Sequence, residues 1–260
     1  MVHGELWGIA AEGWIAIATI FGGFAVLASG AAVLFGFFHG AKEVAKAQEA
    51  TDVRRYLLDE GGMALKAGLD GALEMTRLNH AIVLRLLLGL KFTPPGHPFA
   101  PRPEDIPRLL PTEHPKFNFH AIAPASRLTG CTRLGELMTS AFADIYSTNI
   151  AYEFEIRQPV VRCYEGADLS GIQFEEWKEA AFKTANDVYM KAEKFGPVSN
   201  LLGDAVLRAQ ELHLARTEDI GRIQSDPTMA KIKKQLDALA DEAAKSSAAR
   251  KKKLQARHSS

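Results

Sequence analysis

The sequence is poor in cysteine, and it has no lysine or arginine before Lys42. Its two cysteines, Cys131 and Cys163, cannot build a disulfide-stapled scaffold or a zinc site with four cysteine ligands. Acidic and basic side chains are balanced at 31 each, and 47% of the 260 residues are hydrophobic. This balance excludes a disordered chain and a protein whose main task is to coat nucleic acid. We therefore expect a folded protein whose main partner is not nucleic acid.

The motifs of common enzyme classes are also absent. The chain has no G-x-x-x-x-G-K-[ST] phosphate loop, no G-x-G-x-x-G turn and no H-E-x-x-H zinc helix. It lacks a G-x-S-x-G nucleophile elbow, an S-x-x-K pair and the Glu-x-x-His pairs of di-iron bundles. These absences favour a protein without a cofactor or resident metal, and they favour a role other than catalysis.

A long apolar run lies near the N-terminus. Between Gly13 and Phe38 there are 26 residues without a formal charge. As a helix with about 1.5 Å rise per residue, this run would extend roughly 39 Å, more than the ~30 Å of a bilayer core. A cleaved signal peptide fits less well, because Glu5 and Glu12 replace the expected basic residues and the run is too long. We predict a transmembrane helix, with a buried helical hairpin or an unusual export signal as alternatives.

Charge around this run predicts its orientation. Lys42, Lys46 and Arg54 follow it closely, whereas no basic residue precedes it. The positive-inside tendency then predicts a single-pass protein of the inner (cytoplasmic) membrane with its N-terminus outside and its C-terminal domain in the cytoplasm.

Small residues recur at regular spacing along the predicted membrane helix. Small side chains allow two helices to approach closely, which is how helices associate in lipid. We predict that this helix packs against a second copy or against a larger membrane partner. The predicted packing positions are Ala28, Ala32, Gly36, Gly40, Gly22 and Gly30.

Beyond the apolar run, hydrophobic residues recur with helical periodicity, and no sustained strand alternation occurs. We predict an all-α fold with a single N-terminal transmembrane helix, a cytoplasmic helical bundle and a long proline-rich loop. A break or kink is expected at Gly61–Gly62. These patterns divide the chain into a short N-terminus (1–12), the transmembrane helix (13–39), a juxtamembrane helical segment (40–91), the proline-rich loop (92–124), the helical bundle (125–244) and a basic tail (245–260).

The apolar segment 81–90 is too short to cross a bilayer and contains Arg85. It predicts a helix buried within the folded domain. Asn79, His80 and Arg85 are polar groups in or beside it, and buried polar groups need partners. They could line a pocket, but we favour paired groups in an ordinary core.

Four further helices are predicted after the loop, over residues 128–157, 168–195, 198–224 and 228–255. Gln158-Pro159 is expected to end the first, since the residue before proline avoids helical geometry. Gly196-Pro197 is expected to end the second. Ser225-Asp226-Pro227 predicts a turn and cap before the last.

Nine of the twelve prolines lie in residues 92–124, so this segment cannot form a regular helix or a central strand. A loop of this length typically forms a lid or a docking surface. His97, His114 and His120 lie in or beside it, and Cys131 follows. These four are weak candidates for catalysis or metal binding, because their spacing matches no known ligand pattern; we favour loop anchoring for the histidines and a core thiol.

The C-terminal tail, from Lys245 to Ser260, contains six basic residues and no acidic one. A solvated tail is favoured. The alternative is attraction to an anionic membrane surface, with nucleic acid a third reading. The residues for anionic-surface binding would be Arg250, Lys251, Lys252 and Lys253.

These features together predict a membrane-anchored helical interaction or scaffold protein. It would act as an oligomer or as an accessory subunit of a larger membrane complex. Two alternatives remain open: a membrane-tethered enzyme with a site under the 92–124 loop, and a membrane-bound sensor or effector.

Overall fold

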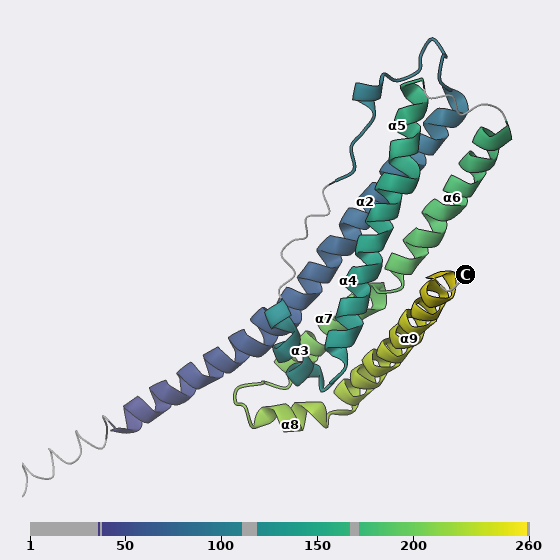
Figure 1. Ribbon diagram of the computed structural model, residues 1–260. Coiled ribbons are helices and arrows are strands. Elements are labelled where there is room, and N and C mark those ends of the chain that lie inside the picture. The colour runs from purple at the N-terminus through teal and green to yellow at the C-terminus, as the bar shows by residue number, and fades with distance from the viewer. Residues whose placement is uncertain (1–35, 37, 111–118, 167–171, 259–260) are drawn as a thin grey trace, which may run out of the picture. The chain divides into compact units, whose positions relative to one another are not determined.

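The structure is a computed structural model that describes residues 36, 38–110, 119–166 and 172–258, without the side chains of 172–173 and 250–258. Within these ranges all regular structure is helical (Figure 1). The all-α part of the predicted fold is therefore confirmed.

The predicted single-pass architecture needs correction. Among the described residues, no helix combines the length and the apolar character needed to cross a membrane. The described helix at 38–54 carries charges from Lys42 onward, which a bilayer core does not accommodate cheaply. The described part of the chain is therefore all-α, and the predicted single-pass architecture finds no support among its helices.

Most of the predicted span, residues 13–35, lies outside the described residues, and so do four of its predicted packing positions. These are Ala28, Ala32, Gly22 and Gly30. The other two, Gly36 and Gly40, have open space where a side chain would stand. The predicted location and orientation depend on the same span and stay predictions.

The chain divides into two units, residues 1–52 and residues 53–260. In the first unit, the helix at 38–52 contains an ion pair between Lys46 and Glu43 at 2.8 Å. Its Thr51 hydroxyl donates to the carbonyl of Ala47. All further description concerns the second unit.

The second unit begins with the π-helical segment η1 (Arg55–Met63), followed by the long helix α2 (Ala64–Phe92). Of the expected break or kink at Gly61–Gly62, the break is wrong, because both glycines lie inside η1, which continues into α2. They permit close packing instead. A Cβ atom at Gly61 would stand 3.0 Å from the backbone nitrogen of Ala125, and one at Gly62 would stand 2.4 Å from Cγ2 of Val206.

The expected helix 128–157 is divided differently in the structure. It comprises the end of α3 (Ile122–Thr129), α4 (Leu134–Ala151) and the π-helical segment η4 (Tyr152–Arg157), which continues into α5 (Gln158–Tyr164). Gly130 adopts a left-handed φ of 70° and ends α3. Pro159 does not end the helix, because it follows a wide π turn in which its ring and missing N–H are accommodated.

The remaining helices are α6 (Ile172–Glu193), α7 (Gly196–Glu211), α8 (Asp219–Gln224) and α9 (Pro227–His258). The expected helix 198–224 is broken near His213, whose φ of 55° is left-handed. The expected cap of the last helix is confirmed, since Oδ1 of Asp226 accepts hydrogen bonds from the backbone N–H groups of Thr228 and Met229.

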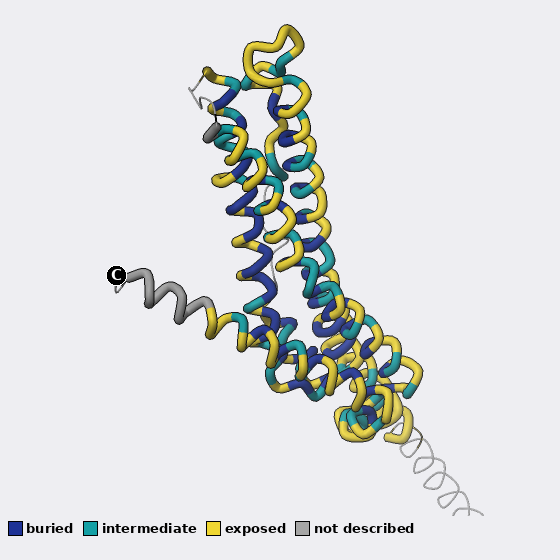
Figure 2. The backbone as a smooth tube through the Cα atoms, turned by 90° about the vertical axis from the view of Figure 1, so that its right-hand side faces the viewer, coloured by how far each residue is buried: buried dark blue, intermediate teal, exposed yellow. Residues whose placement is uncertain are grey.

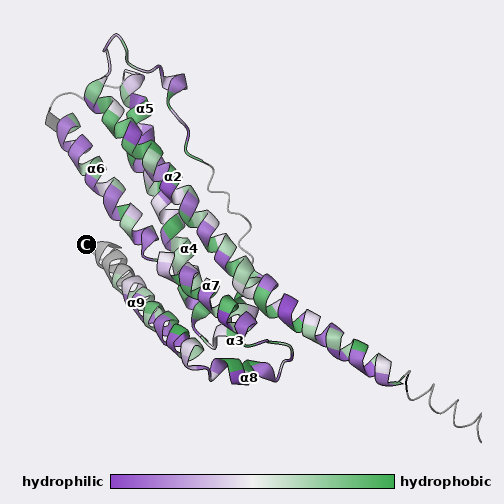
Figure 3. Cartoon of the chain, turned by 180° about the vertical axis from the view of Figure 1, so that it is seen from behind, coloured by the Kyte–Doolittle hydropathy of each residue, from purple (hydrophilic) through white to green (hydrophobic). Residues whose placement is uncertain are grey.

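Helices α2, α4 and α6 pack against one another, and α9 packs against α4 and α7 (Figure 1). Buried residues recur along each long helix between exposed turns (Figure 2), and hydrophobic and hydrophilic residues alternate in the same way (Figure 3). The expected burial of the helix at 81–90 holds for one face only. Ala81, Arg85 and Leu88 are exposed on the other face. The buried residues are Val83, Leu86, Leu87 and Leu90.

Candidate functional site

The structure does not bring the candidate histidines together. His97 lies in the turn after α2, where its Nδ1 accepts a hydrogen bond from the backbone N–H of Phe99 at 3.2 Å. His120 lies in the 3₁₀ turn η3 (Phe119–Ala121), which contacts η1 before the start of α2. The 29 residues of α2 extend roughly 43 Å and separate the two. His114 lies outside the described residues.

The described side chains include no group of three His, Cys, Asp or Glu residues placed to hold a metal ion. Cys131 is fully buried in the core. Burial, together with the nearby Asp237 carboxylate, raises the pKa of its thiol to about 11. A nucleophilic cysteine needs a lowered pKa and access to substrate, so the geometry favours the core reading of Cys131.

We expect both cysteines to resist iodoacetamide at pH 7 in the native chain. Only the thiolate reacts, and burial raises the pKa of Cys163 as it does that of Cys131. Labelling should appear in urea, or as the pH approaches 11. Intact-mass spectrometry measures it, with the exposed variant Lys183→Cys as the positive control. Labelling of Cys131 at pH 7 as fast as that control would contradict the assignment.

The described part of the proline-rich loop is fastened to the bundle. The Asn79 side chain pairs with the Leu110 backbone, accepting from its N–H at 2.7 Å and donating to its carbonyl at 3.3 Å. Arg157 donates to the carbonyl of Pro107, and Tyr164 donates to that of Thr93. Ile106 is buried beside α5. These contacts hold residues 93–110 against their own helices.

The polar groups near segment 81–90 are divided between core and surface. Asn79 is buried and donates to Asn149 at 2.8 Å, and Asn149 donates to the Thr76 hydroxyl at 3.0 Å. His80 lies 2.9 Å from the Tyr152 hydroxyl and stacks on Tyr189. Burial lowers the pKa of His80, so it is neutral at pH 7. Asn79 and His80 therefore have partners within the bundle, which favours a structural role for both. Arg85, expected to be a paired core group, is instead exposed and makes no ion pair in the described part of the chain.

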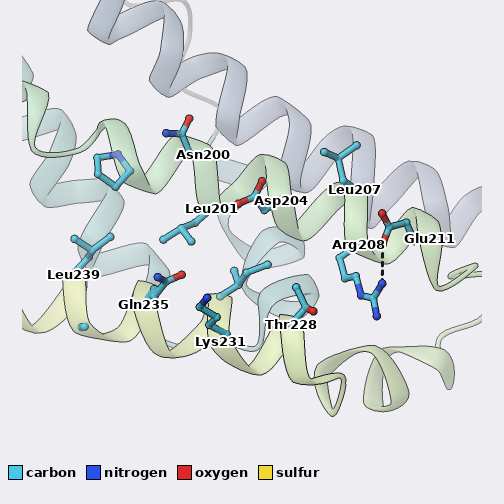
Figure 4. Close-up of a pocket in the computed structure, with 13 residues that line it drawn as sticks. Asn200, Leu201, Asp204, Leu207, Arg208, Glu211, Thr228, Lys231, Gln235 and Leu239 are labelled. Carbon is cyan, nitrogen blue, oxygen red and sulfur yellow. Dashed lines mark hydrogen bonds and ion pairs between the residues drawn. The ribbon is translucent and has the colours of Figure 1, made fainter.

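A groove of about 790 Å³ lies between α7 and α9 (Figure 4). Its apolar lining includes Leu201 from α7 together with Ile232 and Leu239 from α9. Leu207 stands at its edge with 59% of its surface exposed. An exposed leucine beside an apolar groove is typical of a binding surface.

Polar side chains from both helices border the apolar lining. Arg208 is fixed by Asp226 at 2.8 Å and by Glu211 at 2.7 Å, and the Arg208 guanidinium lowers the pKa of Asp226 to about 2. Asp204 and Lys231, in contrast, make no ion pair within the described part of the chain. One negative and one positive charge are therefore available to a ligand, one from each helix.

A second groove of about 730 Å³ lies between α4 and α9. Most of its lining consists of small residues, among them Ala143 and Ala240. Arg133 joins the two helices near its base by contacting Glu136 of α4 and Asp241 of α9. The two carboxylates in this lining, Glu136 and Asp144, are already paired with Arg133 and Lys194. The α7–α9 groove, whose Asp204 and Lys231 make no ion pair in the described part of the chain, is therefore the stronger candidate site.

No protein-family model matches the sequence, and neither a curated protein nor a solved structure matches it significantly. The functional argument therefore depends on the groove itself. Sequence reasoning missed this groove. One signal was present in the four-residue spacing of Asn200 and Asp204, and again of Lys231 and Gln235, which places each pair on one helix face.

Proposed function

We propose that this chain is a non-enzymatic helical interaction protein, a scaffold or accessory subunit, that binds a segment of another protein in its α7–α9 groove. The observation that carries this proposal is an apolar groove lining bordered by polar side chains from both helices, among which Asp204 and Lys231 make no ion pair with any described residue. An amphipathic helix or an extended peptide fits such a groove by burying its apolar side chains and pairing its own charges with Asp204 and Lys231.

The charges specify the partner segment further. It carries apolar residues for the Leu201 and Ile232 surface, an acidic residue for Lys231 and a basic residue for Asp204. The enzyme and sensor alternatives have no comparable observation among the described residues, because the candidate histidines are separated and the loop is fastened down.

Site-specific photo-crosslinking in the native cell tests the proposal. A benzophenone amino acid at Leu207 should give one discrete cross-linked protein, and the same residue at the exposed Lys183 on α6 should not. Lys231→Glu should weaken binding of the captured protein by about tenfold, because it replaces an attraction by a repulsion. The matched control is Lys183→Glu, which alters the same charge away from the groove.

Two outcomes would contradict the proposal. One is the same cross-linked product from Leu207 and from Lys183, which would mean that the groove has no selectivity. The other is a captured protein whose affinity for the chain is unchanged by both Lys231→Glu and Asp204→Lys.

A further inference from the structure

One face of α2 is exposed along most of the helix. This face consists of the residues reached from Ala67 by alternating steps of four and three residues, as far as Phe92. All of these residues except Gly71 are exposed. The large ones are Leu78 at 44%, Leu88 at 46% and Phe92 at 70% exposed. The opposite face is buried in the bundle at positions such as Leu69, Val83 and Leu90.

This alternation is the heptad spacing of a coiled coil, in which an apolar seam recurs every 3.5 residues on average. The seam on α2 extends over 26 residues, roughly 39 Å at about 1.5 Å per residue. It carries only two charged residues, Glu74 and Arg85. Such a long apolar seam on one outer helix predicts a helical partner.

The seam is complementary to itself when two copies are antiparallel. With the two-fold axis between Asn79 and His80, Ala67 of one copy meets Phe92 of the other. In the same register Gly71 meets Leu88, and Leu78 meets Ala81. Every apolar layer then joins a small residue to a large one, which is how facing positions fill space without voids. A parallel pairing would place Phe92 on Phe92 and Gly71 on Gly71.

The charges follow the same register. Glu74 of one copy meets Arg85 of the other, and the two-fold axis repeats this pair. Within one chain, Arg85 has no ion pair in the described part, and Glu74 contacts only Arg77 at a distance of 3.5 Å. A parallel pairing would instead oppose like charges at both positions, so the charges also select the antiparallel register.

We propose that this seam binds a second copy of the chain, giving a two-fold symmetric dimer with antiparallel α2 helices. The dimer surface is separate from the α7–α9 groove and stands independently of the function proposed for it. It also explains why an arginine interrupts the apolar segment 81–90: Arg85 is a selective contact on the outside of the helix.

Charge reversal on the full chain tests the proposal. Glu74→Arg alone and Arg85→Glu alone should each place like charges in contact twice per dimer. Each change should raise the dimer dissociation constant at least tenfold, as measured by sedimentation velocity. An equimolar mixture of the two variants should dimerise like the original chain, because opposite charges then meet at both positions. The control Lys183→Glu should leave the dimer unchanged.

Circular dichroism verifies that each variant stays helical. The equimolar mixture separates charge repulsion from misfolding, because misfolded variants would not regain the dimer when they are mixed. The proposal is overturned if the original chain sediments as a monomer at a concentration of about 100 micromolar. A dimer that is absent at this concentration has a dissociation constant well above it, too weak for a specific assembly. It is also overturned if either single variant dimerises normally, or if the mixture of folded variants stays monomeric.

Discussion

Replacing Asn79 by leucine is expected to lower the free energy of unfolding by about 3–5 kcal/mol and to release the loop at 93–110. The side chain is buried and makes three hydrogen bonds, two with the Leu110 backbone and one with Asn149. Leucine has a similar size but leaves those partners unsatisfied, and each such group costs about 1–3 kcal/mol. Urea unfolding followed by circular dichroism measures the loss.

Limited trypsin digestion separates this effect from general destabilisation. Arg108 lies in the loop before Leu109 and should be cleaved early in Asn79→Leu while the helices remain intact, whereas Pro103 protects the bond after Arg102. The control Glu179→Gln changes an exposed group on α6 and should alter neither readout. A change in stability below about 1 kcal/mol with unchanged cleavage would show that Asn79 does not fasten the loop.

Replacing Gly62 by valine is expected to cost about 3 kcal/mol or more. A Cβ atom there would stand 2.4 Å from Cγ2 of Val206 and 3.2 Å from Cδ2 of Leu128, closer than packed carbon atoms lie. The π-helical segment η1 would have to move away from α3 and α7. Thermal and urea unfolding both measure the loss.

A second substitution tests the mechanism of that loss. Val206→Ala removes the atom that an added Cβ meets, so Gly62→Ala should cost less in the presence of Val206→Ala than alone, by about 1–2 kcal/mol. The control Gly221→Val places a side chain where nothing lies within 4 Å and should cost less than about 1 kcal/mol. Additive effects at Gly62 and Val206 would show that the two sites do not touch.

Capping residues and prolines in the sequence predicted those features of the fold that depend on a few neighbouring residues. The Asp226 cap and the boundary at Gly196-Pro197 are examples, since each is set by hydrogen bonding or by proline geometry within one turn. The Gly61–Gly62 pair shows the limit of such signals. Glycine weakens an isolated helix, but here it permits α3 and α7 to approach η1, and that contact joins residues far apart in the sequence.

The candidate site depended on tertiary structure even more strongly. His97 and His120 are close in sequence, yet His97 follows the end of α2 and His120 lies in η3, which contacts η1 before the start of α2. The α7–α9 groove lies between two packed helices that the turn at His213 and α8 separate in the sequence. Helical periodicity shows which residues of each helix share a face, but it does not show which two faces meet.

The π-helical segment η4 also sets the rotational phase of the helix that follows it. Each residue of an α-helix turns the chain by about 100°, and a π turn takes up one residue more than an α turn. Val160 and Cys163 are buried beside α2 because η4 delays α5 by that one residue. Deleting a single residue such as Glu155 would let η4 close into ordinary α-helical turns and would leave these two side chains in the core. The same deletion in a regular α-helical stretch would instead turn the helix that follows by about 100° about its axis.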